Sequence, residues 1–112
     1  GRGTSASPEP PADVVVIGGG TAGLPLAIAA ATRGLRVTVV EAAGAVGGTL
    51  FMSGGMMAAA GTRLQRRRGI EDSPERHHAD VMRLSGNTAD PAILRLSVRE
   101  AAPTVDWLMD AG

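Results

Sequence analysis

Two short runs of β-branched residues set the pattern of the first part of the chain. Residues 13–17 (DVVVI) are largely apolar and end at a glycine, and residues 35–40 (LRVTVV) form a second such run. Short runs of this kind are typical of buried parallel strands. Residues 21–32, between them, consist mainly of Ala and Leu and predict a helix that ends near Gly34. The pattern therefore predicts a βαβ unit with a right-handed crossover.

The rest of the chain changes from an uncharged loop to a helical pattern. No charged residue occurs between Glu41 and Arg63, and Gly, Ala and Met dominate, so we expect a buried loop at residues 42–61, followed by a basic surface stretch at residues 63–68. Ser73-Pro74-Glu75 predicts a helix that runs to Ser85 and stops at Gly86. Asp90-Pro91 begins another helix, and we expect Pro103 to interrupt it before a further helical segment at residues 104–111.

Composition limits the class of protein. The 112 residues have a formal net charge of zero and no Cys, so neither a disulfide framework nor a global basic field for nucleic acid is expected. Phe51 and Trp107 are the only aromatic residues, and an isolated fold with so few large side chains would be marginal. We expect a disordered tail at residues 1–12, with no intact secretory signal, and no membrane span, which favours a cytoplasmic location.

The segment between the first strand and the first helix carries a nucleotide-binding pattern. Gly18-Gly19-Gly20-Thr21-Ala22-Gly23 fits G-x-G-x-x-G, and Glu41 ends the next strand. In this context the first glycine permits a tight turn, the second lets a pyrophosphate approach the backbone, and the third lets helix and strand pack closely. The helix N-terminus offers N–H groups to phosphate, and the acid can accept hydrogen bonds from ribose hydroxyls, which disfavours a 2′-phosphate. A ligand-free glycine turn is the less favoured alternative.

A second glycine-rich segment follows the acid closely. It contains Gly44, Gly47-Gly48-Thr49 and then Ser53-Gly54-Gly55-Met56. A nicotinamide-binding domain would normally continue into regular βα structure at this point. The repeated glycines instead favour backbone contacts to the ribityl chain and pyrophosphate of a flavin nucleotide, and hence FAD over NAD.

Several sequence blocks resemble one known family. Residues 47–62 (GGTLFMSGGMMAAAGT) resemble the flavin-contacting loop of the fumarate reductase and succinate dehydrogenase flavoprotein superfamily, with soluble fumarate reductase-like flavoproteins nearest. The resemblance continues through residues 69–75 (GIEDSPE), 80–82, 90–91 and 105–108 (VDWL), and it covers residues 13–112. It implies an α/β, Rossmann-like FAD/NAD(P)-binding fold, a parallel sheet with packed helices, of which residues 13–112 form an incomplete N-terminal portion. The superfamily includes ketosteroid dehydrogenases, urocanate reductase and L-aspartate oxidase, so the substrate stays open.

The resemblance also implies which residues contact FAD. It places contacts at Ala22, at Glu41 on the adenosine ribose, and at Thr49, Leu50, Gly54 and Gly55 along the flavin side. Two positions depart from the family, which often has Asn-Thr in place of Thr49-Leu50 and a basic residue in place of Ala42. Combined with the glycine motif, the candidate cofactor-binding residues are Gly18, Gly20, Thr21, Ala22, Gly23, Glu41, Ala42, Gly48, Thr49, Leu50, Ser53, Gly54 and Gly55.

No catalytic residue or metal ligand is assigned, since the substrate-binding Arg and His residues of the family lie beyond these 112 residues. We expect the FAD-binding portion of a flavin-dependent oxidoreductase that moves hydride between flavin and a substrate C–C bond. The remainder of the enzyme or a second polypeptide would complete it. A non-catalytic dinucleotide-binding module or an inactive truncated fragment is the alternative, and the second glycine segment disfavours an NAD-linked protein.

Three further features have ordinary interpretations. His77 and His78 are adjacent, so on a helix they diverge by about 100° and do not form the i, i+4 pair of a helical metal site. Residues 66–68 are all Arg but lack interleaved aromatic residues, which favours a solvated face over a nucleic-acid site. Met52, Met56 and Met57 fit either a flavin pocket or simple gap filling, and both interpretations stay open.

Overall fold

The structure is a computed structural model that describes residues 10–112. These residues divide into two compact units, with the boundary between Met56 and Met57. Most of the predicted disordered tail lies outside the described residues, and residues 10–12 form no helix or strand. Within residues 10–112, no helix has both the length and the apolar character needed to cross a bilayer.

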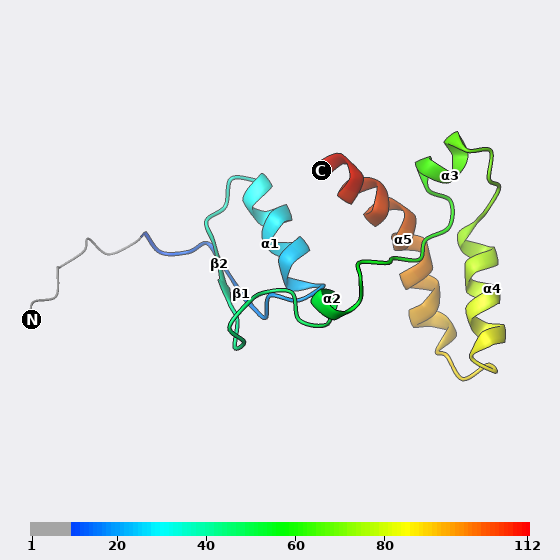
Figure 1. Cartoon of the computed structure of the whole chain (residues 1–112), viewed down its shortest axis with the longest axis horizontal. Coiled ribbons are helices and arrows are strands. Elements are labelled where there is room, and N and C mark those ends of the chain that lie inside the picture. Colours follow the sequence, from blue (N-terminus) through cyan, green and yellow to red (C-terminus); the bar gives the residue numbers. More distant parts are fainter. Residues whose placement is uncertain (1–9) are drawn as a thin grey trace, which may run out of the picture. The chain divides into compact units, whose positions relative to one another are not determined.

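The first unit is a βαβ unit followed by a loop (Figure 1). Strand β1 (Val14–Ile17) and strand β2 (Val37–Val40) pair in parallel, with Val14 opposite Val37 and Ile17 opposite Val40. Helix α1 (Gly23–Thr32) contacts both strands. The predicted parallel pair and its connecting helix are therefore confirmed, and each element is shorter by one or two residues than its sequence pattern suggested.

One face of this sheet packs on α1 and the other is bare. Side chains alternate between the two faces of a strand. Val16 is buried on the helix side, where it approaches Gly23, and Ala30 of the helix is buried as well. On the opposite face Val15 is 58% exposed and Ile17 is 87% exposed. The sequence pattern predicted a strand covered on both faces, but within residues 10–112 only the face toward α1 is covered.

Pro25 lies in the first turn of α1, where a proline is tolerated. The helix begins at Gly23, so Pro25 is its third residue. The flanking N–H groups of Leu24 and Leu26 donate to the carbonyls of Gly20 and Ala22, at 3.1 and 3.2 Å. N–H groups in the first turn have few intrahelical partners, so a proline there removes little.

Residues 42–61 are more exposed than their composition suggested. A short helix, α2 (Thr49–Met52), interrupts the predicted loop. Residues 48–58 are all exposed, while Gly47 and Ala60 at the two ends are buried. The prediction of a buried loop is therefore wrong for residues 10–112, because no other described segment covers the middle of it.

The second unit contains three helices, α3 (Arg63–Arg67), α4 (Pro74–Leu84) and α5 (Pro91–Ala111). Helices α4 and α5 pack against each other, and Figure 1 shows them side by side after a tight turn. The predicted start of α4 is confirmed, since the Ser73 side chain accepts from the N–H of Arg76. Asp90 caps α5 by accepting from the N–H groups of Ala92 and Ile93.

The basic stretch at residues 63–68 is mostly exposed, as predicted, and residues 63–67 form helix α3, which Thr62 and Gln65 cap reciprocally in a capping box. The prediction for Pro103 is wrong. Helix α5 continues through Pro103 as one helix instead of breaking. A proline removes only one hydrogen bond of the ladder, and two features favour continuation: Ala102 is buried just before Pro103, and Arg63 contacts Asp106 and Asp110 after it.

Candidate functional site

The glycine turn of residues 18–23 connects β1 to α1 and depends on glycine at two of its motif positions. Gly18 has φ of +100°, a left-handed conformation that side chains disfavour. A Cβ on Gly23 would lie 1.8 Å from the carbonyl oxygen of Gly18, so helix and turn pack with no room for a side chain. Around Gly20 a Cβ would meet nothing within 4 Å. The second motif glycine therefore borders open space, which fits its predicted role beside a ligand.

Four consecutive backbone N–H groups at this turn are available to an anion. Within residues 10–112 no hydrogen bond is found for the N–H groups of Gly20, Thr21, Ala22 and Gly23. The start of α1 has no side-chain cap and no acidic residue in its first turn. Free N–H groups at a helix N-terminus favour phosphate or another anion. The geometry therefore fits a pyrophosphate cradle.

The carboxylate of Glu41 lies at the same turn. Because β1 and β2 are parallel with Ile17 opposite Val40, the residues that follow them meet at one edge of the sheet. Gly18 N–H donates to the Val40 carbonyl at 2.7 Å, and Gly19 N–H donates to Glu41 Oε2 at 2.7 Å. Oε1 accepts from the N–H of Ala43 at 3.0 Å. The backbone N–H groups of Ala43 and Gly19 lower the pKa of this carboxyl, which favours its charged form.

The start of the second glycine segment approaches the first. Gly47 N–H donates to the Gly19 carbonyl at 2.7 Å, and a Cβ on Gly48 would lie 3.7 Å from Gly20 Cα. Both Gly47 and Gly48 have positive φ, at +120° and +52°. The first two residues of the second glycine segment therefore lie beside the first segment, together with Glu41.

The later part of that segment makes local hydrogen bonds only, within the described residues. Thr49 and Leu50 begin helix α2, and the Ser53 hydroxyl is used locally, donating to the Leu50 carbonyl and accepting from Gly55 N–H. Gly54 and Gly55 have positive φ and open space around them. No hydrogen bond joins residues 49–55 to the turn at residues 18–23 within the described part of the chain. Ala42, beside Glu41, is exposed.

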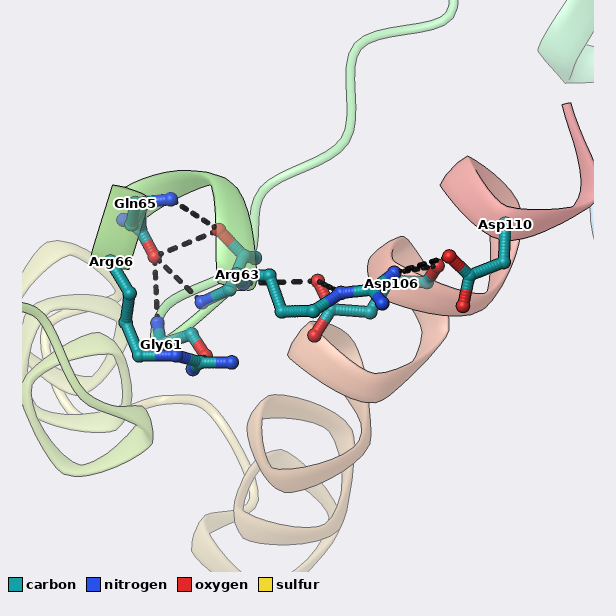
Figure 2. Close-up of polar contacts among 7 residues, drawn as sticks. Gly61, Arg63, Gln65, Arg66, Asp106 and Asp110 are labelled. Atoms are coloured by element: carbon teal, nitrogen blue, oxygen red, sulfur yellow. Dashed lines mark hydrogen bonds and ion pairs between the residues drawn. The ribbon is translucent and has the colours of Figure 1, made fainter. Parts of the chain in front are cut away.

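Sequence reasoning did not find a polar cluster in the second unit (Figure 2). The side-chain Oε1 of Gln65 accepts from the N–H groups of Gly61 and Thr62, and the Arg66 guanidinium donates to the Gly61 carbonyl at 2.6 Å. The Arg63 guanidinium donates to Asp110 Oδ1 at 2.6 Å and to the Asp106 carbonyl at 2.9 Å. The contact with Asp110 raises the pKa of Arg63. This cluster joins α3 to α5, and the Thr62-x-x-Gln65 capping signal was its one visible sign in the sequence.

The remaining candidate side chains belong to elements other than the glycine turn. His78 lies on α4 with Nε2 3.1 Å from the Pro91 carbonyl oxygen, and the neighbouring His77 has a buried Nδ1. Arg67 and Arg68 are exposed. Met52 and Met56 are 84% and 91% exposed, so they do not fill a gap in the described unit.

Comparison with known proteins gives consistent matches. Residues 13–112 match a family described as FAD binding domain. The chain is 40% identical over 100 residues to NADH:fumarate oxidoreductase of Klebsiella pneumoniae (strain 342), covering 89% of this chain and 11% of that protein. It is 35% identical over 108 residues to a fumarate reductase (cytochrome) of Shewanella frigidimarina, covering 96% and 19%.

A solved structure agrees with these matches. The 3-ketosteroid-delta4-(5alpha)-dehydrogenase of Rhodococcus jostii RHA1, in complex with 4-androstene-3,17-dione, superimposes with a TM-score of 0.76 at 36% identity. The match covers 90% of this chain and 21% of that one. The chain thus spans between 11% and 21% of the length of these three relatives.

Proposed function

This chain belongs to the FAD-binding-domain family of fumarate reductase-like and ketosteroid dehydrogenase-like flavoproteins, and from that premise we propose how its residues bind the cofactor. FAD is the cofactor of this family. The observation that supports the proposal is the convergence of four unpaired N–H groups, the Glu41 carboxylate and Gly47–Gly48 at one edge of the sheet.

The first glycine segment binds the adenosine and pyrophosphate half of FAD. The N–H groups of Gly20, Thr21, Ala22 and Gly23 donate to pyrophosphate oxygens, and Gly18 provides the turn. Glu41 accepts from the adenosine ribose hydroxyls with its unused lone pairs, and Ala42 lies beside that sugar.

The second glycine segment binds the flavin half. Gly48, Thr49, Leu50, Ser53, Gly54 and Gly55 present backbone and small side chains to the ribityl chain and ring. Positive φ at Gly54 and Gly55 lets the backbone approach a ligand where a side chain would be strained. The Ser53 hydroxyl, which holds Gly55 N–H at 3.3 Å, supports this local conformation.

The whole protein is an oxidoreductase that transfers hydride between flavin and a C–C bond of its substrate. Bound FAD supplies the redox chemistry, while residues 13–112, the N-terminal portion of the FAD-binding domain, bind and orient it. The bare sheet face at Val15 and Ile17 is covered by the remainder of the enzyme or by a second polypeptide. A cytoplasmic location stays a prediction.

Substitution of Gly20 tests this function. Gly20→Asp places a charged side chain where pyrophosphate binds, so FAD binding should be lost in a calorimetric titration of the chain with FAD. Gly44→Asp is the matched control, because it makes the same charge change at another open glycine in the first unit. Unchanged FAD affinity of the Gly20 variant would remove the cradle assignment. Visible absorbance of the complex detects bound flavin. Loss of that absorbance when substrate is added indicates an enzyme, and unchanged absorbance indicates a binding module.

A further inference from the structure

We infer that Glu41 is a positioning residue for the glycine turn in addition to its proposed contact with ribose. The inference rests on the proposed function, because it concerns the same FAD site. The carboxylate already accepts two backbone hydrogen bonds from different segments, at Gly19 and at Ala43. An acid that served the sugar alone would not need either contact.

Gly19 shows what the carboxylate holds. This residue is buried, its N–H donates to Glu41 Oε2 at 2.7 Å, and its carbonyl accepts from Gly47 N–H at 2.7 Å. A Cβ there would lie 3.0 Å from Val46 Cγ1 and 3.3 Å from Glu41 Oε2. Gly19 is therefore fully engaged within the protein, in contrast to the four N–H groups that follow it.

The turn therefore has two parts: Gly19 is bonded within the protein, and the N–H groups of residues 20–23 are free to bind a ligand. Because Glu41 fixes Gly19, the next four N–H groups keep one orientation before any ligand arrives. A site whose donors are already oriented loses less entropy on binding than one that must be ordered. The second oxygen extends the same effect to Ala43, at the start of the segment that returns to Gly47.

The carboxylate also retains capacity for the sugar. An ionised carboxylate offers about four lone-pair sites, and the two N–H contacts use two of them. The ribose hydroxyls can therefore bind while Gly19 and Ala43 stay held. The two roles predict different behaviour toward a ligand without those hydroxyls.

The test compares FAD with an analogue whose adenosine ribose lacks both hydroxyl groups, titrated into the full chain by calorimetry. Glu41→Gln keeps the size of the side chain, but its one acceptor oxygen can hold only one of the two N–H groups well. A positioning role predicts that Glu41→Gln weakens FAD and the analogue alike, by about tenfold. A role limited to ribose predicts weaker FAD binding only. In that case the Glu41→Gln variant should bind the analogue as tightly as wild type does, or more tightly, because a negative charge near the phosphates has been removed.

A matched control separates positioning from general destabilisation. Asp13 Oδ2 accepts from Arg36 N–H at 2.8 Å, so a carboxylate makes the same kind of bridge at the opposite end of the two strands. Asp13→Asn should lower thermal stability and leave both affinities unchanged. Gly19→Ala is a second variant, since its Cβ crowds Glu41 Oε2 while the charge of the carboxylate stays. It should also weaken the analogue.

The outcomes distinguish the two proposals. If the wild-type chain binds FAD and either turn variant binds the analogue as tightly as wild type does, the positioning role is wrong and the proposed function stands. If Asp13→Asn weakens the analogue as much as Glu41→Gln does, the effect is general destabilisation and the inference fails. If the wild-type chain binds neither flavin, the proposed function fails, and the inference fails with it.

Discussion

At the scale of single residues, Gly23 has the least tolerance for a side chain. Its Cβ would lie 1.8 Å from the Gly18 carbonyl oxygen and 3.1 Å from Val16 Cγ1. We therefore expect Gly23→Ala to lower the free energy of unfolding of the first unit by about 2 kcal/mol, since overpacking outweighs the gain in helix propensity. Urea denaturation measures this, with Gly44→Ala as a control in open space. Equal midpoints for the two variants would contradict the close packing of turn and helix.

The sequence predicts those parts of the site in which a particular residue type is needed for the backbone geometry. Gly18, Gly23 and Glu41 follow from the motif, because a tight turn, a close helix and an acid after the next strand have fixed spacing. The hydrogen bonds from the Gly19 and Ala43 N–H groups to Glu41 could not be predicted, since every residue type except proline supplies a backbone N–H. The exposure of Ser53, Gly54 and Gly55 could not be predicted either, because the low charge of this segment does not show whether another part of the protein covers it.

At the scale of elements, Pro103 lies in the interior of α5, where it cannot donate a hydrogen bond. The residue is exposed, so Pro103→Ala leaves no cavity, and the new N–H can donate to the Arg99 carbonyl. We expect Pro103→Ala to raise the free energy of unfolding of the second unit by about 2 kcal/mol. This value is smaller than the full cost of an interior proline, because alanine also increases the entropy of the unfolded chain. Pro91→Ala is the control, since a proline in the first turn of α5 displaces no helical bond. Destabilisation by Pro103→Ala, measured by urea, would show that packing depends on the proline.

Element boundaries followed local signals, and the errors came from tertiary context. Ser73 and Asp90 each cap the helix that their sequence signals predicted. Pro103 was expected to interrupt a helix because its local preference is strong, yet the helix continues, with Ala102 buried before it and Asp106 bound by Arg63 after it. Residues 63–68 were expected to be a basic surface stretch, and most of them are exposed. The helix at residues 63–67 was not predicted, and it depends on the capping pair Thr62 and Gln65 and on the Arg63 contacts to α5.

At the scale of the whole molecule, the described residues bury too little apolar surface for a firm core. The buried apolar residues are Val16, Ala30, Ala60, Val98 and Ala102, none of them larger than valine. Several much larger side chains stay outside, among them Ile17, Phe51, Met52 and Met56, each at least 84% exposed. Small buried side chains contribute little hydrophobic free energy, and exposed ones contribute none. The free energy of unfolding of residues 10–112 therefore depends on what else binds them.

FAD should supply part of the missing stability. The FAD-free chain is expected to unfold over a broad range at low temperature, because its core is thin. FAD at about a hundred times its dissociation constant adds about 2.7 kcal/mol through mass action, provided that the unfolded chain does not bind it. Circular dichroism melts with and without FAD measure the shift, and Gly20→Asp should melt without any shift when FAD is added. A sharp, cooperative transition of the FAD-free monomer would contradict this, since it would show that the few buried valine and alanine side chains suffice.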